Sequence, residues 1–477
     1  MHKNNRLKSF VTLIAILTFQ VGCTERKSTI TPNSLNKSNI KNGHHASPFA
    51  ARSTKIILIN KTDVTLTRQS YGLYHGIWTY IPPSYVEKNT ERTWSSESSG
   101  IFTGTEGQAI FNTPTGSKIL FEWNNPYSGS NSYIYTENQN IYNISKSGGT
   151  GNNATVTFTV TNRDIPKKYN IIIMSDPQAW RLDNNSDPNN NQYNWESFIS
   201  KVRLSLEGLN SSLPPADKIR FGLLNGDITE FGRTSQRESF TKNFQSPLAS
   251  SFYIYLGLGN HDYANNVNDC TDGDDLGLNA CARRMVSFMG EAITYYRSEL
   301  PLFNDDYNEY SNVYGSLSYS WDYGDMHYVQ LQNHPTYHVD LTHWYFNTVY
   351  ITESLDWLQK DLQAARSRGK TIVINFHDGT EHFINNTSAQ QKEKFQSILN
   401  SNNVMAVFIG HTHNAGELSG SAKPSLYGTT RVFNSGALFK GDFLFVKVDG
   451  KCLSVLIYNG SAGTSSLKTT LPQVCAK

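Results

Sequence analysis

The stretch Asn170–Gln178, with the sequence NIIIMSDPQ, is an apolar run that stops at a serine, an aspartate and a glutamine. A short apolar run bounded by turn-forming residues is typical of a buried strand. The pattern recurs in four later runs, Phe221–Leu224, Phe252–Leu258, Thr371–Phe376 and Val404–Ile409. Amphipathic helical spacing occurs between such runs, in Trp195–Leu209 and Ser354–Arg368. Alternating strands and helices predict an α/β layered domain in which polar residues gather where strands end.

Each of these strand ends carries side chains that bind hard metal ions. In chain order they are Asp176 with Gln178, Asp227, Asn260-His261-Asp262, His377-Asp378 and His411-Thr412-His413. A single Gly-Asp is most often a turn, and a single Asn-His pair is usually a cap or a loop. Five such clusters, each after an apolar strand, instead predict one metal site at a common edge. The lack of cysteine among them argues against a closed structural zinc site.

The order D-x-[HQ], GD, GNH[DE], H and GHxH resembles the calcineurin-like metallophosphoesterase family over about residues 166–477. Ser318–Leu331 (SYSWDYGDMHYVQL) resembles a strand of that family between the third and fourth clusters. The resemblance implies a four-layer α/β (α+β) domain, a two-layer β-sandwich flanked by helices, that holds two metal ions. Carried over by position, one ion would be held by Asp176, Gln178, Asp227 and His413, and a second, bridged by Asp227, by Asn260, His377 and His411.

The chemistry of such a pair of ions follows from its charge. Two dications about 3.5–4 Å apart need a bridging carboxylate to relieve their repulsion, which is the role expected of Asp227. They acidify a shared water into hydroxide and neutralise charge on the phosphoryl oxygens. Imidazole with carboxylate and amide oxygens favours Mn, Fe or Zn over Ca. His261 is then expected to be the general acid that protonates the leaving oxygen, with Asp262 orienting its imidazole.

Gln178 departs from the family pattern, which more commonly has histidine at that position. An amide oxygen is a weaker donor than imidazole, so the first ion would be bound loosely or have another identity, or Gln178 would lie outside its coordination sphere. Four further histidines also have two interpretations, because they would either line the substrate pocket or lie in surface or packed loops: His334, His338, His343 and His382.

Residues 55–161 have a strand-like texture and predict an all-β sandwich. The phrases SGIFTGTEGQAIF (Ser99–Phe111) and FEWNNPYSGSNSY (Phe121–Tyr133) resemble aegerolysins and related bacterial crystal-protein-like domains, small sandwiches that bind membrane lipids. Aromatic residues suit a lipid interface, although each one alone would also suit the core: Tyr71, Tyr74, Trp78, Tyr80, Tyr85, Trp94, Trp123, Tyr127 and Tyr133. Membrane lipid binding is therefore predicted for this domain, with a generic accessory β-domain as the alternative.

Residues 1–22 have the pattern of a secretory signal, in which three basic residues precede the apolar run Phe10–Phe19. The run is too short to span a bilayer. Gly-Cys at its end resembles a bacterial lipobox and predicts lipid anchoring at Cys23, although Gln20 stands where such motifs usually have an aliphatic residue. An ordinary cleaved signal, which would leave a periplasmic or secreted protein, is the alternative. Residues 23–54 are polar and predict a flexible tether.

Four cysteines remain beyond Cys23, and in an exported protein an even set indicates disulfides. Three connectivities are possible, of which the two local pairs, Cys270–Cys281 and Cys452–Cys475, are the simplest. The first pair lies in a polar insertion after Asp262 that would shape the substrate site. Its acidic residues predict a solvated loop, with calcium binding as the alternative: Asp269, Asp272, Asp274 and Asp275.

The chain of 477 residues has a net charge of +2 and no Lys/Arg stripe, so nucleic acid is not an expected partner. The patterns together predict an exported phosphoesterase that hydrolyses monoesters or diesters, with phospholipid headgroups as one candidate substrate. Two alternatives stay open: a membrane-binding toxin or adhesin with a phosphoesterase scaffold, and a periplasmic or surface nucleotide phosphodiesterase. Substrate, metal identity and oligomeric state do not follow from the sequence, because a fold fixes neither leaving group nor assembly.

Overall fold

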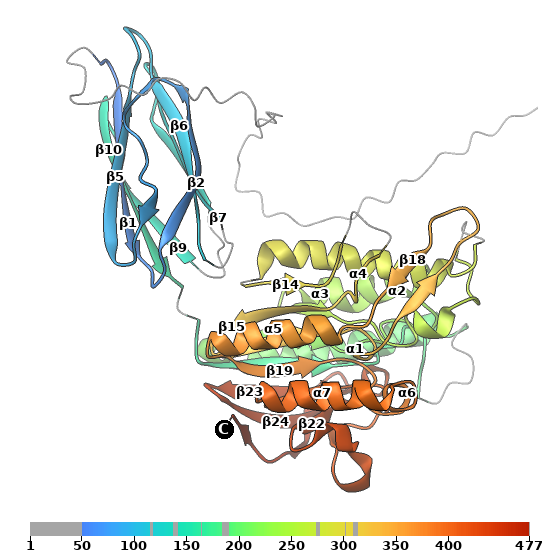
Figure 1. Ribbon diagram of the computed structural model, residues 1–477. Helices are drawn as coiled ribbons and strands as arrows, with labels where there is room; N and C mark the ends of the chain where they lie inside the picture. Colours follow the sequence, from blue (N-terminus) through green and yellow to red (C-terminus); the bar gives the residue numbers. More distant parts are fainter. Residues whose placement is uncertain are drawn as a thin grey trace, which may run out of the picture.

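The computed structural model describes residues 50–114, 118–136, 142–163, 165–183, 190–272, 277–300, 302–308 and 313–476. The predicted signal, Cys23 and most of the predicted tether lie outside the described residues, as do Asp274 and Asp275. An all-β domain, blue and cyan in Figure 1, is followed along the chain by a larger mixed domain that runs from green to red. This architecture confirms the predicted combination of a β-sandwich with an α/β (α+β) layered domain.

The all-β domain consists of ten strands in two five-stranded sheets. The strands are β1 (Ser53–Lys61), β2 (Leu66–His75), β3 (Ile77–Tyr80), β4 (Tyr85–Val86), β5 (Thr90–Glu97), β6 (Thr105–Asn112), β7 (Lys118–Asn125), β8 (Ser132–Thr136), β9 (Tyr142–Gly148) and β10 (Asn153–Asn162). One sheet has the order β3-β5-β1-β10-β9, and the other has the order β4-β2-β6-β7-β8. β1 pairs with β10 in parallel, whereas its other neighbour, β5, is antiparallel.

Side chains along β6, β7 and β10 alternate between core and surface, as the pleat of a half-buried strand requires. Trp94 and Trp123 are each 1% exposed and belong to the core between the sheets. The indole nitrogen of Trp123 donates to Ser96 Oγ at 2.9 Å, which satisfies its one polar atom. Four of the other aromatic residues named above are exposed by 38% to 57%: Tyr74, Tyr80, Tyr85 and Tyr127. The aromatic residues of this domain therefore divide between core and surface.

The mixed domain contains two seven-stranded sheets. The first is built from β11 (Lys168–Met174), β12 (Ile219–Leu224), β13 (Tyr253–Leu256), β23 (Asp442–Asp449), β24 (Cys452–Asn459), β25 (Ser466–Thr470) and β26 (Val474–Cys475). The second is built from β14 (Asn304–Asp305), β15 (Tyr319–Tyr323), β16 (Met326–Gln330), β19 (Thr371–Asn375), β20 (Ala406–Ile409), β21 (Gly416–Glu417) and β22 (Arg431–Asn434). Their orders are β13-β12-β11-β23-β24-β25, with β26 paired to β24, and β14-β15-β16-β19-β20-β22-β21. Of the strands that carry the predicted ligands, β12, β13, β19 and β20 are parallel to their neighbours, whereas β11 is parallel to β12 but antiparallel to β23.

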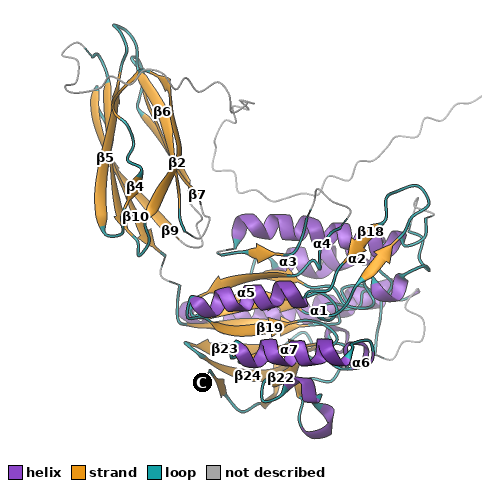
Figure 2. Cartoon of the chain, viewed as in Figure 1, coloured by secondary structure: helices purple, strands orange, loops and turns teal. Residues whose placement is uncertain are grey.

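The helices of this domain are α1 (Gln192–Ser212), α2 (Thr234–Phe240), α3 (Ser246–Leu248), α4 (Ala280–Glu299), α5 (Leu355–Ser367), α6 (Glu381–Asn385) and α7 (Ala389–Ser401). A π-helical turn, η3 (Thr241–Gln245), joins α2 to α3. Short 3-10 turns are η2 (Pro215–Asp217), η4 (Ala264–Asn266), η5 (Gly420–Ala422), η6 (Ser425–Tyr427) and η7 (Leu438–Lys440). A two-stranded hairpin consists of β17 (Val339–Leu341) and β18 (Val349–Ile351). Figure 2 shows helices and strands of the domain in separate layers.

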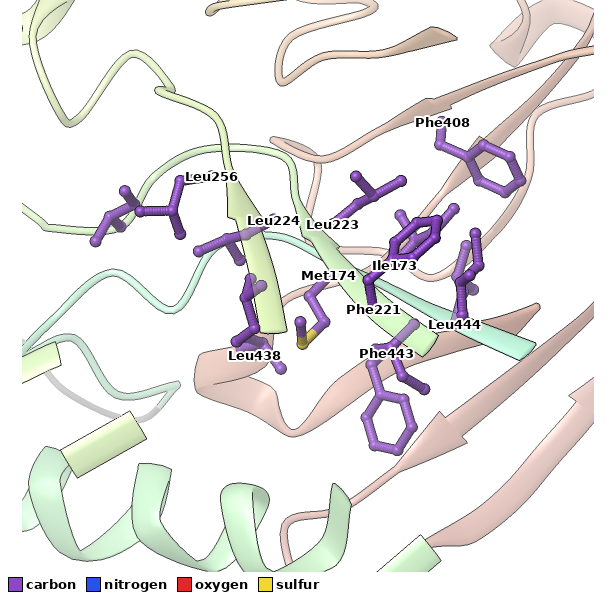
Figure 3. Close-up of a cluster of buried hydrophobic side chains, with 14 of the residues drawn as sticks. Ile173, Met174, Phe221, Leu223, Leu224, Leu256, Phe408, Leu438, Phe443 and Leu444 are labelled. Atoms are coloured by element: carbon purple, nitrogen blue, oxygen red, sulfur yellow. The ribbon is translucent and has the colours of Figure 1, made fainter. Parts of the chain in front are cut away.

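The two sheets share the larger hydrophobic core, part of which Figure 3 shows. Ile173 of the first sheet and Val373 of the second belong to this core, as does Trp195 of α1. The neighbouring side chain Ile372 belongs instead to a second core, together with Leu358 of α5. Because successive residues of a strand point to opposite faces, this division places the second sheet between the first sheet and helices α5 and α7. The layering is the one that the sequence predicts.

Two further sequence predictions have outcomes in the fold. Ser318–Leu331 forms not one strand but the hairpin β15–β16, which turns at Gly324 with φ of 60°. The disulfides are Cys270–Cys281 and Cys452–Cys475, which confirms the local pairing. None of the helices in the described part of the chain is long and apolar enough to cross a membrane.

Candidate metal centre

The predicted ligands lie on loops directly after β11, β12, β13, β19 and β20, and their backbones are strained. Five of the seven have left-handed backbone angles: Asp176 (φ 54°), Gln178 (φ 35°), Asp227 (φ 53°), His411 (φ 70°) and His413 (φ 58°). Each such residue with a side chain costs on the order of 1–3 kcal/mol, and such residues cluster at sites that hold ligands. Hydrogen bonds fix two of the loops together, because Asp176 N donates to Gly226 O at 3.0 Å and Gln178 N to Asp227 O at 2.9 Å.

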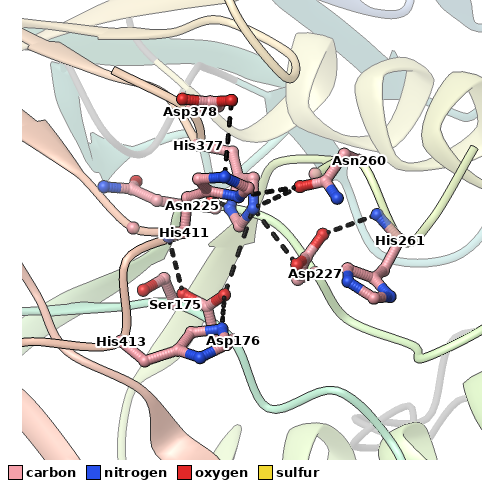
Figure 4. Close-up of polar contacts among 12 residues, drawn as sticks. Ser175, Asp176, Asn225, Asp227, Asn260, His261, His377, Asp378, His411 and His413 are labelled. Carbon is pink, nitrogen blue, oxygen red and sulfur yellow. Dashed lines mark hydrogen bonds and ion pairs between the residues drawn. The ribbon is translucent and has the colours of Figure 1, made fainter. Parts of the chain in front are cut away.

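Asp176, of the first cluster, contacts the last of the five clusters, His411-Thr412-His413. Its side chain is fully buried, and Oδ1 lies 3.2 Å from Nε2 of His413. Its other oxygen, Oδ2, accepts a hydrogen bond of 3.1 Å from the backbone nitrogen of His411 (Figure 4). The two ends of the domain sequence that were predicted to share one ion are therefore in direct contact.

His377 brings the other clusters together. Its Nε2 lies 3.1 Å from Asp227 Oδ2, 3.0 Å from Asn260 Oδ1 and 4.0 Å from Asp176 Oδ1. Asn260 Oδ1 is also 3.0 Å from Nδ1 of His411. The Nδ1 atom of His377 lies 2.8 Å from the carbonyl oxygen of Asn225, which fixes the proton on Nδ1 and turns Nε2 toward the oxygens. The structure thus assembles all but one of the predicted ligands through direct contacts.

Gln178 is the remaining predicted ligand, and its side chain is fully buried. Neither its amide oxygen nor its amide nitrogen has a hydrogen-bond partner. Asp176 Oδ1 and Asp227 Oδ2 are also buried, and among the described residues their close polar neighbours are the imidazoles of His413 at 3.2 Å and His377 at 3.1 Å. Buried polar atoms are nearly always hydrogen-bonded, so the unpartnered amide of Gln178 indicates a missing ligand. The chemistry of the set, carboxylate with imidazole and amide oxygen, fits divalent ions, and Asp176, Asp227 and His377 present ligand atoms within 4.8 Å of one another.

The protonation equilibria of the centre reflect the same crowding of charge. Burial works against a charged imidazole at His377, but the carboxylates of Asp227 and Asp176 outweigh it and raise its pKa to about 10. Burial likewise works against a charged carboxylate at Asp227, but His377 and His261 outweigh it and lower the pKa of Asp227. For His411, burial and the nearby His377 lower the pKa. Without an ion, one proton on His377 therefore partly balances two buried carboxylates.

His261, the predicted general acid, borders this cluster. Its backbone nitrogen donates to Asp227 Oδ1 at 2.9 Å, and its Nδ1 lies 3.0 Å from the carbonyl oxygen of Glu230 and 3.6 Å from Glu230 Oε2. The other carboxylate oxygen of Glu230 lies 3.5 Å from Nη1 of Arg181. Burial works against a charged imidazole, but Asp227 and Glu230 outweigh it and raise the pKa of His261.

Asp262 does not have the orienting contact that the sequence suggested. Its carboxylate accepts hydrogen bonds from the backbone nitrogens of Ile228, Thr229 and Gly259 and from the hydroxyl of Thr229, all within 3.1 Å. These bonds hold two ligand loops together, while Glu230 takes the place beside the His261 ring. Burial, with Asp227 nearby, raises the pKa of Asp262 to about 7. Sequence reasoning missed Glu230, for which the only signal is an acidic residue three positions after Asp227.

Of the four additional histidines, His382 lies next to a predicted ligand, and the other three lie elsewhere in the domain. His382 lies with its ring 5.3 Å from that of His411, and its Nδ1 is 2.7 Å from Asp378 Oδ2. His334 is buried against Phe383, and burial lowers its pKa to about 4. His338 is exposed, with Nδ1 3.2 Å from its own loop backbone, and His343 lies in the β17–β18 hairpin. Asp378, His382 and His411 form a second group whose ligand atoms lie within 4.8 Å of one another.

Comparison with known proteins agrees with both domains. The calcineurin-like phosphoesterase profile matches residues 169–415, and the aegerolysin profile matches residues 51–163. An uncharacterised protein of Dictyostelium discoideum is 33% identical over 138 residues, which are 28% of this chain but only 12% of that relative.

Among solved structures, purple acid phosphatase PPD1 from yellow lupin (Lupinus luteus) is similar over 89% of this chain and 74% of its own, with 12% identity and a TM-score of 0.38. The lipid-binding protein Nakanori is similar over 24% of this chain and 72% of its own, with 14% identity and a TM-score of 0.22. At these TM-scores the two structures add no argument to the profile matches. Because the first profile spans more than half of the sequence and contains all seven predicted ligands, the chain belongs to the calcineurin-like phosphoesterase family.

Proposed function

We propose that the chain hydrolyses phosphoester bonds at a centre of two divalent ions. The observation that carries this proposal is a buried cluster in which the amide of Gln178 has no hydrogen-bond partner and the carboxylates of Asp176 and Asp227 face the imidazoles of His413 and His377. A protein core does not keep a buried amide in this state unless another group satisfies it. Family membership supports the class of chemistry, and the direct contacts among six of the seven predicted ligands support the location.

The ligands divide between two ions. Asp176, Gln178 and His413 would hold the first, Asn260, His377 and His411 the second, and Asp227 would be shared. The sharing is supported by distances, because Asp227 Oδ2 lies next to His377 Nε2 while the backbone of its loop is bonded to that of Gln178. Mn, Fe and Zn suit this mixture of oxygen and nitrogen ligands.

Bound ions would supply the positive charge that activates water and stabilises a phosphoryl group in transfer. The chain's own residues then have separate tasks. Asp227 would offset the repulsion between the ions, and the strained loops hold the ligand atoms in fixed positions. His261 has its Nδ1 turned toward Glu230, which leaves Nε2 to donate a proton to the leaving oxygen. Loss of such a general acid typically lowers the rate by about 10²–10⁴-fold.

A substrate and metal screen tests this activity. The protein, stripped with a chelator, is supplied with Mn, Fe or Zn and assayed on p-nitrophenyl phosphate and on its bis-ester. We expect metal-dependent turnover, and the ratio of the two rates separates a monoesterase from a diesterase. Asp227→Asn should abolish turnover, whereas the exposed carboxylate variant Asp449→Asn should not. Full activity in Asp227→Asn would show that the proposed centre is wrong.

We propose further that the protein is exported, is anchored through Cys23, and binds membrane lipids through its aegerolysin-like domain. Support for the lipid contact comes from a loop of that domain on which Ile101 and Phe102 are 76% and 71% exposed. A cleft of ≈ 480 Å³ lies beside the loop and is lined in part by His75, Glu106 and Tyr127. Exposed apolar side chains next to a polar cleft suit a lipid, because a lipid has apolar tails and a polar headgroup.

Two assays test these points. Liposomes incubated with the protein are analysed for released choline phosphate, ethanolamine phosphate and free phosphate. Release of any of them would identify phospholipid headgroups as substrates, and activity on soluble esters alone would exclude this. Cys23→Ser should move the protein from the membrane fraction to the soluble fraction of the cell. Because the aegerolysin-like domain is also proposed to bind lipid, the fractions are compared after an alkaline carbonate wash, which removes proteins held by peripheral contacts. A membrane fraction that resists the wash equally in both proteins would refute the anchor.

A further inference from the structure

A hairpin of the phosphoesterase domain exposes three consecutive aromatic side chains. Between β17 and β18, Trp344, Tyr345 and Phe346 are exposed by 65%, 84% and 62%. Neighbouring aromatic residues of this size are seldom left in water, because each ring has about 150–250 Å² to bury. The hairpin projects from the domain in Figure 1. We call residues 342–348, which connect the two strands, the aromatic tip.

The aromatic tip is held in place by hydrogen bonds. Nδ1 of His343 accepts from the backbone nitrogens of Tyr345 and Phe346 at 3.0 and 3.3 Å. Nη1 of Arg283 donates to the carbonyl oxygens of Leu341 and Asn347 at 2.9 and 2.8 Å, so one side chain joins both ends of the tip. Arg283 belongs to α4, whose Cys281 is bonded to Cys270. The exposure of the rings is therefore built into the fold.

The chemistry of the tip fits one kind of surface. From Leu341 to Ile351 the chain has no Asp, Glu, Lys or Arg, in a protein in which 17% of residues are charged. Its backbone groups at Leu341, Tyr345, Phe346 and Asn347 already have partners, so moving the tip out of water leaves them satisfied. These properties suit a fluid bilayer interface, where Trp and Tyr are enriched, better than the shaped surface of a protein.

We propose that the aromatic tip inserts into the interface of a lipid bilayer and docks the phosphoesterase domain on the membrane. The loop that leads into β17 starts at the metal centre, because Asn333 O accepts hydrogen bonds from the backbone nitrogens of His377 and Asp378 at 3.0 and 2.9 Å. Docking at the tip would therefore bring the rim of the centre toward the lipid surface. The contact itself does not depend on the proposed hydrolysis and is separate from the lipid contact proposed for the aegerolysin-like domain.

Vesicles of phosphatidylcholine and phosphatidylethanolamine provide the first test. The variant Trp344→Ser/Tyr345→Ser/Phe346→Ser should bind them at least about tenfold more weakly than the unchanged protein, because burying even one such ring favours binding by this factor or more. The matched control is Tyr193→Ser, which removes an equally exposed ring, 82%, from the start of α1. Thermal unfolding of each variant verifies the fold. Equal vesicle binding by the triple variant and the unchanged protein would overturn the proposal.

Fluorescence quenching by brominated lipids provides the second test and isolates this contact from any other membrane contact. Trp344→Phe keeps an apolar ring but removes the indole, so the difference in quenching between the unchanged protein and this variant reports on Trp344 alone. We expect brominated vesicles to quench the unchanged protein more strongly than the variant. Identical quenching would show that Trp344 stays outside the bilayer, and would overturn the proposal even if the triple variant bound weakly. Neither measurement uses turnover, so failure here leaves the proposed hydrolysis untouched.

Discussion

Two buried groups in the phosphoesterase domain each combine carboxylates with a histidine, yet their hydrogen bonding differs. In one, His327 lies between two carboxylates, with Nδ1 2.7 Å from Asp322 Oδ1 and Nε2 2.8 Å from Asp361 Oδ2. The remaining oxygens are also satisfied, because Arg368 donates to both oxygens of Asp322 at 3.0 Å and Asn304 donates to Asp361 at 2.8 Å. We call these residues the His327 group.

The second group is the metal centre, in which His377 takes the corresponding place between Asp227 and Asp176. Here both polar atoms of Gln178 are buried without a hydrogen-bond partner, and Asp176 Oδ1 and Asp227 Oδ2 face the histidine rings with no Arg or Asn donor, among the residues that the structure describes, like those of the His327 group. A satisfied ionic group holds a fold together, whereas an unsatisfied one at the ends of several strands is a place for a ligand. The two groups contain the same kinds of residue, so the comparison depends on the further donors, Arg368 and Asn304, that the His327 group has and the metal centre lacks within the described part of the chain. The predictions below apply the same kinds of change to both.

The largest effect is expected in the His327 group. Asp361→Asn should lower the free energy of unfolding by about 3–5 kcal/mol, because it leaves a buried histidine without one of its two carboxylates. Denaturant unfolding measures this loss. The metal content of the purified variant should not change, since Asp361 contacts none of the predicted ligands that the structure describes. Loss of metal together with stability would mean that the two groups are not independent.

The same substitution in the metal centre should act on catalysis. Asp176→Asn is expected to lower kcat/KM on p-nitrophenyl phosphate by at least about 10²–10³-fold, the usual effect of removing one group that stabilises a transition state. It should also lower the bound metal, measured by elemental analysis, because it removes a charged ligand next to His413. The unfolding free energy of the metal-free variant should fall little. A large loss in the metal-free state would assign Asp176 to the structural class.

Metal removal should affect only one of the groups. With free ion at about a hundred times its dissociation constant, binding contributes about 2.7 kcal/mol to stability, and a chelator removes that contribution. Chelation should therefore lower the melting temperature of the unchanged protein and of Asp361→Asn, and the two falls should correspond to a similar loss of unfolding free energy. The losses should be similar because the effects of changes at independent sites are additive. Asp176→Asn should respond little. Equal chelator sensitivity of Asp176→Asn and the unchanged protein would contradict the assignment.

The sequence predicts the strand ends of the centre because both signals are local. An apolar run marks a buried strand such as β11, and a polar residue directly after it, such as Asp176, must lie at the strand's carboxyl end. Parallel neighbours then place Asp227 at the same edge. The structure brings these side chains together as expected, while their binding of metal stays a prediction.

Other features depend on contacts that no local pattern contains. Asp262 adjoins His261 in sequence, but its carboxylate accepts hydrogen bonds from backbone nitrogens of another loop. Glu230 lies next to the His261 ring instead. Asp322 and Asp361 are separated by 39 positions of the sequence, and both reach the ring of His327 because β15, β16 and α5 pack together. In the aegerolysin-like domain, composition alone does not separate the buried Trp94 from the exposed Tyr80.

The smallest effect, and the most specific, is the pH dependence of the His327 group. Burial works against the charged ring, but hydrogen bonds to Asp322 and Asp361 outweigh it and raise the pKa of His327. Burial is likewise outweighed at Asp322, where His327 and Arg368 lower the pKa. A raised histidine pKa adds stability that is fully present below the unfolded value of about 6.5 and is lost as the pH rises through the folded pKa.

The lowered pKa of Asp322 has the opposite sign, since it adds stability that is present above the unfolded value of about 3.9 and is lost as the pH falls through the folded pKa. The stabilisation that the group provides should therefore be greatest between about pH 4 and 6.5. The measurement is the difference in unfolding free energy between the unchanged protein and His327→Gln, followed across pH with the chelator present. We expect this difference to narrow toward alkaline pH. A difference that stays constant would mean that His327 is neutral in the folded protein, so that hydrogen bonding without charge holds the two carboxylates.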